Sequence, residues 1–236
     1  HSFSRRQRQM CIRDSSETHI EFEKRTGKKI LERYGMTETN MNISNPYDGS
    51  RKAGTVGIPL PGIEIRIVNE EGKEVEEGQI GTIELKGENI FKGYWGMEEK
   101  TKESFKDDGF FITGDLAKKD ENGYFTIVGR DKDMIISGGL NVYPKEIEDV
   151  INELPNITES AVFGVQHDDF GEAVVAAVVT TDDKNDGSQI LDYTKDKIAK
   201  YKQPKKIIFM SNLPRNSMGK VQKNKLRENN KSLFKS

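Results

Sequence analysis

The most basic stretch of the chain holds one lysine in a setting that suits catalysis. Residues 213–227 read LPRNSMGKVQKNKLR and contain five basic side chains, with Lys220 directly after Gly219. A lysine ammonium is a compact point charge on a flexible stem, and a glycine beside it keeps its loop unhindered. Such a charge can stabilise a transition state in which two anionic groups approach each other. The alternative is a solvated basic tail, which is how we interpret Lys223 and Lys225.

A second motif, YGMTET at residues 34–39, combines groups that bind phosphate and metal. Gly35 lets backbone approach a ligand closely, and Tyr34 offers a ring to pack on an adenine face. The hydroxyl of Thr37 can donate to a phosphate oxygen, and the carboxylate of Glu38 suits Mg²⁺ bound to nucleotide phosphates. Taken alone, the motif is better explained as a turn with a capping threonine and a solvated glutamate.

The motif ITGD at residues 112–115 places Asp115 after an expected strand and a glycine. A carboxylate there can accept hydrogen bonds from both hydroxyls of a ribose, as acidic residues do in dinucleotide-binding folds. Its alternative is an Asx turn, which is common after glycine. Arg130 adds a fork of donors for ribose and phosphate oxygens, against the alternative of a surface salt bridge worth ~0–1 kcal/mol.

The segment GRDKDMIISGGLNVYPKEIE, residues 129–148, separates two patterns of strands and contains two adjacent glycines. Gly138 and Gly139 allow backbone to line a narrow passage without side chains. Considered alone, the pair is better explained as a simple turn.

The four motifs together occur in an order and at a spacing that resemble the adenylate-forming superfamily. This superfamily comprises acyl-CoA synthetases, luciferases and the adenylation domains of peptide synthetases. The resemblance covers residues 16–230 and rests on YGMTET, ITGD, the segment at 129–148 and PRNSMGK. The run TETNMNISNPYDG and the segments FFITGDL and KVQKNKLR look most like the malonyl-CoA and methylmalonyl-CoA synthetases.

The resemblance implies a two-step ligase reaction that uses ATP, Mg²⁺ and CoA. A small carboxylic acid, here malonate or methylmalonate, attacks ATP to give an acyl-AMP and pyrophosphate, and the CoA thiol then displaces AMP. Lys220, Thr37 and Glu38 would be the catalytic residues of the first step, with Glu38 as the Mg²⁺ ligand. Lys132 would be the hinge about which the C-terminal domain rotates before the second step.

The same resemblance assigns residues to the two nucleotide-containing molecules. Gly138 and Gly139 would line the channel for the pantetheine arm of CoA. Ile127 would pack against adenine, and its alternative is a plain core residue of a strand. The ATP- and AMP-binding set is Tyr34, Gly35, Thr37, Asp115, Ile127 and Arg130.

The strand pattern and the resemblance predict an α+β/α/β fold in two parts. Residues 16–130 would be the C-terminal part of the AMP-binding large domain, with a β-barrel-like subdomain, and residues 131–236 a small, mobile α+β domain. We expect residues 1–15 to be a non-native leader. The expected helices lie at the start of 16–33, at 144–154 and at 188–201. The expected strands are a short one that leads into Tyr34 and those at 63–67, 83–85, 110–112, 124–128, 134–136, 161–165, 173–180 and 207–210.

Two parts that the resemblance calls for are not found in the sequence. One is a loop rich in Ser, Thr and Gly whose backbone N–H groups cradle the outer phosphates of ATP, and the other is most of the acid pocket. We therefore expect the sequence to be the C-terminal part of a longer enzyme, inactive on its own. The acid substrate stays open, so a ligase for a fatty or aryl acid, or a domain that loads a carrier protein, is an alternative.

The C-terminal end of the chain is basic, whereas the rest of the chain is acidic. The net charge of the 236 residues is −2, but residues 198–236 hold eleven basic residues and one acidic residue, a net of +10. This suggests contact with an anion or with the acidic body. A nucleic-acid-binding module is the alternative from another functional class. No aromatic stacking platform is interleaved with the basic residues, so we expect no nucleic-acid partner. A non-catalytic remnant that binds a partner is a third alternative.

Composition limits the remaining classes of function. No apolar run approaches the ~20 residues that span a bilayer, so we expect no membrane partner. The chain has one cysteine, Cys11, and three scattered histidines, which excludes an intrachain disulfide and a zinc-type ligand set. We expect a cytoplasmic protein, or a mitochondrial matrix protein if the source is eukaryotic.

Overall fold

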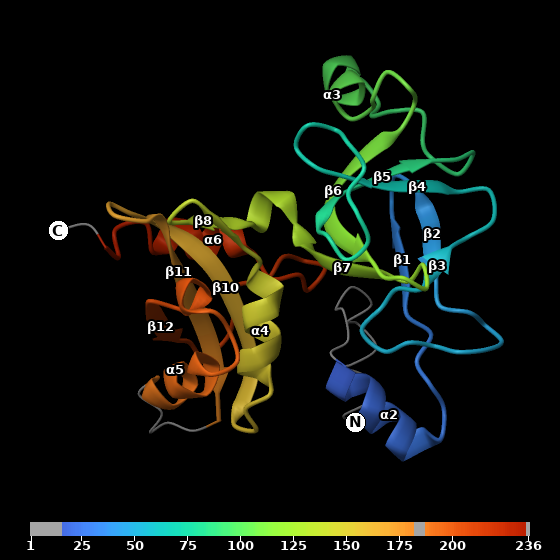
Figure 1. Cartoon of the computed structure of the whole chain (residues 1–236). Coiled ribbons are helices and arrows are strands. Elements are labelled where there is room, and N and C mark those ends of the chain that lie inside the picture. Colours follow the sequence, from blue (N-terminus) through green and yellow to red (C-terminus); the bar gives the residue numbers. More distant parts are fainter. Residues whose placement is uncertain (1–15, 182–186, 235–236) are drawn as a thin grey trace. The chain divides into compact units, whose positions relative to one another are not determined.

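The described residues form two compact units that divide between Asp131 and Lys132 (Figure 1). The structure, a computed structural model, describes residues 16–181 and 187–234. The first unit contains described residues 16–131 and the second contains described residues 132–234. The expected leader, residues 1–15, and most of the polar loop at 181–187 lie outside the described residues.

The first unit consists of two antiparallel sheets and two helices. The smaller sheet has the order β1-β2-β3 and the larger sheet the order β4-β5-β6-β7, so every neighbour in it is also the next strand along the chain. The helices are α2 (Ser16–Thr26) and α3 (Glu98–Glu103). The strands are β1 (Arg33–Met36), β2 (Asn40–Ser44), β3 (Ile58–Pro59), β4 (Glu64–Val68), β5 (Gly81–Lys86), β6 (Phe111–Lys119) and β7 (Phe125–Arg130).

The core of the first unit is formed by apolar residues that alternate with polar ones along its strands. In β4, Ile65 and Ile67 point to the face on which Ile83 and Leu85 of β5 are fully buried, as the period of two in a strand requires. The same cluster includes residues of the smaller sheet, among them Ile43 and Tyr34. The two sheets of this unit therefore share one core.

The second unit is a mixed five-stranded sheet with helices on both faces. Its path is β10-β11-β8-β9, and β12 runs parallel to β11 on the other side. The strands are β8 (Ile135–Ser137), β9 (Leu140–Val142), β10 (Ile157–His167), β11 (Gly171–Thr180) and β12 (Lys206–Phe209). The helices are α4 (Pro144–Asn152), α5 (Ser188–Lys195) and α6 (Lys223–Asn229), with 3₁₀ turns at Asp131–Asp133 and Lys200–Lys202.

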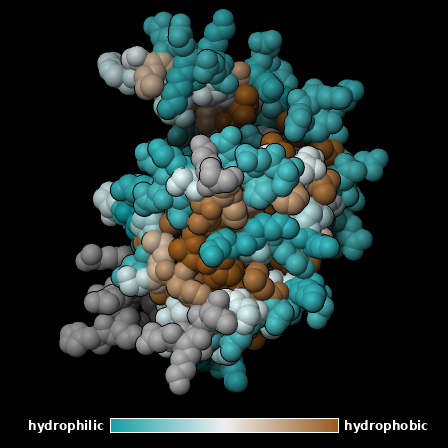
Figure 2. All heavy atoms as spheres, turned by 90° about the vertical axis from the view of Figure 1, so that its left-hand side faces the viewer, coloured by the Kyte–Doolittle hydropathy of each residue, from teal (hydrophilic) through white to brown (hydrophobic). Residues whose placement is uncertain are grey.

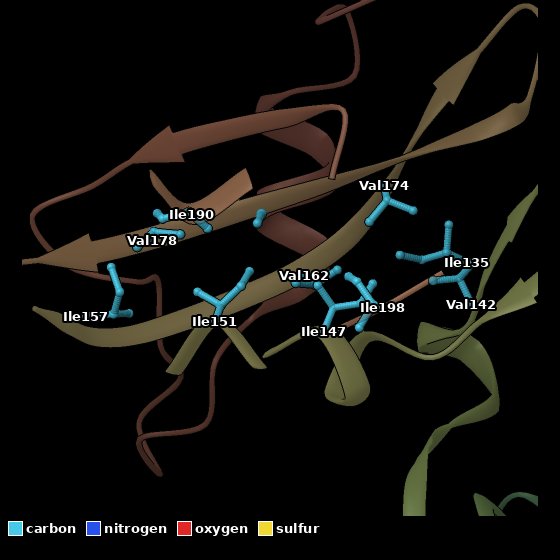
Figure 3. Packing of buried hydrophobic residues seen from close by; sticks show 11 residues of the cluster. Ile135, Val142, Ile147, Ile151, Ile157, Val162, Val174, Val178, Ile190 and Ile198 are labelled. Carbon is cyan, nitrogen blue, oxygen red and sulfur yellow. The ribbon is translucent and has the colours of Figure 1, made fainter. Parts of the chain in front are cut away.

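Strand β11 is buried on both faces, which explains its continuous apolar run. Val174, Ala176 and Val178 join the cluster under α4 and α5 (Figure 3), while Val175 and Ala177 face the cluster that includes Leu226 of α6. Parallel pairing with β12 is typical of such strands. More of the apolar residues packed against the second cluster are only partly buried. Figure 2 shows apolar side chains at the surface of one face of the molecule, among hydrophilic ones.

Most expected elements are confirmed with shifted ends, and five elements were not expected. The helix predicted at 188–201 ends at Lys195 and is followed by a 3₁₀ turn, and the strand predicted from Phe110 begins at Phe111. The unexpected elements are β2, β3, β9, α3 and α6. No helix among the described residues is long and apolar enough to cross a membrane.

Candidate functional site

The YGMTET motif forms the hairpin between β1 and β2. Tyr34 and Gly35 lie in β1, and Thr37 and Glu38 lie in the turn that follows. Glycine is required at position 35 because a Cβ there would collide with the carbonyl oxygen of Asn40. Asn40 itself adopts a positive φ of 55°, which is uncommon outside glycine. The local sequence thus folds the hairpin tightly and presents Thr37 at the surface.

A second segment, residues 87–94, fixes this turn. The N–H of Phe91 donates to the carbonyl oxygen of Glu38 at 2.8 Å. The amide of Asn89 donates to the carbonyl oxygen of Thr39 and, at 2.9 Å, to Oδ1 of Asn42. The sequence analysis missed these contacts. No pattern in the segment, GENIFKGY, indicated them.

Tyr94 in the same segment orients the Glu38 carboxylate. Its hydroxyl donates to Oε1 of Glu38 at 3.2 Å. Burial, and then the nearby Glu38 carboxylate, raise the pKa of Tyr94, so the phenol keeps its proton at neutral pH. The neutral hydroxyl of Tyr94 therefore orients the Glu38 carboxylate through this hydrogen bond.

Asp115 is the most deeply buried of the predicted site residues. The residue is only 3% exposed. Oδ2 accepts a 2.7 Å hydrogen bond from the hydroxyl of Tyr34. Oδ1 lies 3.0 Å from Nε of Arg130, which is opposite Asp115 in the β6–β7 register. The structure thus brings Tyr34, Asp115 and Arg130 together.

Oδ1 of Asp115 has unused hydrogen-bonding capacity. It is buried, and within residues 16–181 and 187–234 no group donates a well-aligned hydrogen bond to it. The Arg130 guanidinium neutralises its charge without that alignment. Because a buried acceptor is costly to leave unpaired, this oxygen fits a ligand hydroxyl.

Tyr34 and Ile127 belong largely to the core. Tyr34 is 8% exposed and Ile127 is 5% exposed, and both are members of the cluster that fills the first unit. Adenine packing on these two residues stays a prediction. The structure adds a role that the sequence did not indicate for Tyr34, which is to hold Asp115.

Metal-binding side chains do not cluster in the described part of the chain. No three or more His, Cys, Asp or Glu side chains gather there as a metal site. Glu38 would then be a single protein ligand. That fits Mg²⁺, which usually takes one or two carboxylates and completes its shell with water and phosphate oxygens.

Lys132 lies at the point where the two units divide. It is the middle residue of the 3₁₀ turn Asp131–Asp133 and is exposed to solvent. The turn joins β7 of the first unit to the second unit. This location is compatible with the predicted hinge.

Gly138 and Gly139 form the two-residue turn between β8 and β9. Their φ values are +60° and +77°, and the pair Ser137↔Leu140 closes the hairpin. Two-residue hairpin turns with positive φ at both positions favour glycine. The turn is exposed, so its backbone is accessible to a ligand.

Lys220 lies in a more rigid turn than we expected. The side-chain oxygen of Asn216 accepts hydrogen bonds from the N–H groups of Met218 at 3.0 Å and Lys220 at 2.9 Å. The N–H of Asn216 donates in return to the carbonyl oxygen of Lys220 at 2.9 Å. Gly219 has a φ of +82°, which completes the turn. The backbone of the turn is thus fixed, while Lys220 is exposed to solvent.

Arg215 ties this turn to the sheet. It donates to the carbonyl oxygen of Gly219 at 2.6 Å and pairs with Glu159 of β10. It also forms a bridge with Val221 through the backbone. The sequence analysis counted Arg215 only as part of the basic stretch, and missed that it and Asn216 shape the turn.

Comparison with known protein families gives two matches. The model described as AMP-binding enzyme matches residues 14–95, and the model described as AMP-binding enzyme C-terminal domain matches residues 146–220. A malonate–CoA ligase of Arabidopsis thaliana is 41% identical over 88% of this chain and 36% of its own length. A long-chain-fatty-acid–CoA ligase of Yersinia pestis is 39% identical over 86% of this chain and 36% of its own length.

Solved structures also match the chain over most of its length. ATP-bound MatB from Rhodopseudomonas palustris superposes with a TM-score of 0.90 and is 57% identical over 94% of this chain and 44% of the MatB chain. The chain therefore spans well under two thirds of the length of these relatives. The resemblance to the adenylate-forming superfamily and the fold that it predicts are confirmed.

Proposed function

Because the chain belongs to the AMP-binding enzymes, we propose that it is part of an acid–thiol ligase that forms an acyl-AMP and passes the acyl group to CoA. The observation that supports this most directly is the buried Asp115, fixed by Tyr34 and Arg130, whose Oδ1 accepts no well-aligned hydrogen bond from the described residues. The two curated relatives described above are CoA ligases.

Asp115 would bind the ribose of ATP. A ribose hydroxyl that donates to Oδ1 would satisfy an oxygen that otherwise stays buried without an aligned donor. Arg130 forms an ion pair with the carboxylate and has further N–H groups for ribose or phosphate oxygens. Tyr34 fixes the direction of the carboxylate through its hydroxyl.

The β1–β2 turn would bind the phosphates. Thr37 is exposed and can donate its hydroxyl to a phosphate oxygen. Glu38, oriented by Tyr94, would be the protein ligand of Mg²⁺. When bound, the metal neutralises phosphate charge and helps to orient the phosphates.

Lys220 would stabilise the transition state of adenylation. In that step a carboxylate oxygen attacks the α-phosphorus of ATP, a bond to this oxygen forms, and pyrophosphate leaves. Both reacting groups are anionic, so an ammonium placed between them lowers the barrier. The Asn216 turn makes Lys220 a charge on a firm support, so the movement that delivers it would be that of the unit, about Lys132.

The Gly138–Gly139 turn would act in the second step. The CoA thiol attacks the acyl carbon of the acyl-AMP, a thioester forms, and AMP leaves with the bonding electron pair. A turn without side chains lets the narrow pantetheine arm pass. Exposed backbone at Gly138 and Gly139 is compatible with that role.

Malonate is the acid that we propose. The support is the run TETNMNISNPYDG, which resembles the malonyl-CoA synthetases, together with the match to a malonate–CoA ligase of Arabidopsis thaliana. The alternative is another carboxylic acid, because the 41% identity to the malonate–CoA ligase of Arabidopsis thaliana differs little from the 39% for the fatty-acid ligase.

A full-length chimera tests the nucleotide site. In this MatB chimera, residues 16–236 follow the part of Rhodopseudomonas palustris MatB that the chain does not match. We expect malonate-dependent exchange of pyrophosphate into ATP. Asp115→Asn, which keeps the shape but weakens the acceptor, should raise KM for ATP at least about tenfold. An active chimera whose KM for ATP is unchanged by Asp115→Asn would refute the proposed ribose contact.

A further inference from the structure

A side-chain carboxylate, not a backbone carbonyl, holds the strand that leads into the glycine turn. Oε2 of Glu172, near the start of β11, accepts a 2.9 Å hydrogen bond from the N–H of Ile136 in β8. Bonds from N–H groups to carboxylates are charge-assisted and stronger than those to neutral acceptors. This bond therefore weighs heavily in a strand of only three residues.

Strand β8 has few other ties to β11. Their ladder has a single register pair, Ser137 with Gly171. The N–H of Gly138 adds one bond, 2.8 Å to the carbonyl oxygen of Phe170. The β8–β9 hairpin is therefore anchored to β11 by two hydrogen bonds, from the N–H groups of Ile136 and Gly138. The register pair of Ser137 and Gly171 lies between them.

The neighbouring strand leaves space for the Glu172 carboxylate. A Cβ added to Gly164 of β10 would lie 2.6 Å from Oε1 and 2.8 Å from Cδ of Glu172. It would also lie 3.0 Å from Cγ2 of Ile135 in β8. Any side chain at position 164 would therefore displace the carboxylate, or β8, or both.

We propose that Glu172 is a positioning residue for the Gly138–Gly139 turn, and that Gly164 is glycine so that the Glu172 carboxylate can reach β8. This inference rests on the proposed function, in which the turn lines the passage for CoA. Glu172 would then affect the thioester-forming step and CoA binding, and leave adenylation unchanged. A merely structural carboxylate would change the stability of the fold and affect both steps alike.

Amide exchange in the chain itself tests the positioning. Glu172→Ala removes the acceptor, and Glu172→Gln keeps a neutral one at the same place. We expect Glu172→Ala to speed exchange of the Ile136 and Gly138 amides about tenfold, with Glu172→Gln between it and wild type. Amides that bond across the β10–β11 ladder should not change. Unchanged exchange at Ile136 and Gly138 in Glu172→Ala would overturn the proposal.

The control removes a carboxylate of the same unit that contacts no part of the hairpin. Glu153 accepts hydrogen bonds from Tyr193 and Lys197. Glu153→Ala should leave exchange at Ile136 and Gly138 at the wild-type rate. Gly164→Ala should reproduce the effect of Glu172→Ala if it folds, and Glu172→Gln supplies the graded comparison if it does not.

Kinetics of the MatB chimera test the consequence. We expect Glu172→Ala to raise KM for CoA about tenfold while exchange of pyrophosphate into ATP stays within about twofold of wild type. Equal loss in both assays would overturn the specific role. If the wild-type chimera forms acyl-AMP but no thioester, the proposed function fails in its second step, and amide exchange alone still decides whether Glu172 positions the turn.

Discussion

The hydroxyl of Tyr34 donates a 2.7 Å hydrogen bond to Oδ2 of Asp115, although 81 positions separate the two residues in the sequence. The bond is buried and joins β1 of the smaller sheet to β6 of the larger one. One contact thus connects the YGMTET and ITGD motifs, which sequence analysis could only place side by side as separate nucleotide-binding signatures.

Removing this hydroxyl should cost stability. Tyr34→Phe leaves a buried carboxylate without its donor, and hydrogen bonds to charged groups contribute about 1.5–3 kcal/mol. We expect the free energy of unfolding in urea to fall by about that amount. Tyr124→Phe is the matched control, because its hydroxyl donates to the carbonyl oxygen of Ser50 at an exposed site. Equal stability of the two variants would contradict the account.

Arg66 should be important for the first unit because it neutralises a buried acid. Glu84 is 1% exposed, and Arg66 donates to it at 2.6 Å, while Lys106 lies 3.7 Å away. Arg66→Met removes the closer partner and leaves Glu84 poorly compensated. Breaking a buried pair on one side costs about 3 kcal/mol or more, which urea unfolding would measure. Lys86→Met is the control. Lys86 is exposed, and its ammonium lies over the ring of Phe110, as the guanidinium of Arg66 does.

The stability of the first unit should depend on pH through Asp108, the more exposed carboxylate that Arg66 contacts. A hydrogen bond from Arg66 lowers the pKa of Asp108 below its ordinary value. A lowered folded-state pKa means that the contribution of Asp108 to stability is present above the unfolded value, about pH 4, and is lost as pH falls through the folded value. We expect wild type to exceed Asp108→Asn in stability at pH 6 and the difference to shrink as the pH is lowered below about 4. A constant difference across that range would show that Asp108 does not act through its charge.

Substitutions at Gly138 and Gly72 should have similar effects on stability but different effects on CoA binding. Gly138→Ala forces alanine to a φ of +60°, which costs roughly 1–2 kcal/mol. Gly72→Ala is a matched control, because Gly72 has a φ of +75° in a turn of the first unit and no atom lies within 4 Å of an added Cβ. Both variants should lose similar stability in urea unfolding. In the MatB chimera only Gly138→Ala should raise KM for CoA, and an equal rise in both variants would argue against a CoA passage at this turn.

Regular patterns allowed much of the fold to be predicted from sequence. The alternation of Ile65 and Ile67 gave β4, and Pro144 at the first turn gave the start of α4. Strand β9 has only three residues, too few for a period to show. Helix α6 buries a single residue, Leu226, so its apolar face leaves no stripe in the sequence.

The candidate site was predicted in its residues but not in its contacts. Types and spacing picked out Asp115, Glu38 and Lys220, because carboxylates, hydroxyls and a lysine suit nucleotide chemistry. Their supports come from distant positions: Tyr94 lies 56 residues from Glu38, and Tyr34 lies in another sheet from Asp115. Contacts of this kind depend on how strands pack, which local patterns do not encode.

The central claim is that Lys220 acts in adenylation and the Gly138–Gly139 turn in thioester formation. The measurement that tests it most directly compares both half-reactions of the MatB chimera with Lys220→Ala. We expect exchange of pyrophosphate into ATP to fall about 10²- to 10³-fold, while formation of malonyl-CoA from supplied malonyl-AMP stays close to wild type. Equal loss of both half-reactions, or unchanged exchange of pyrophosphate, would contradict the account.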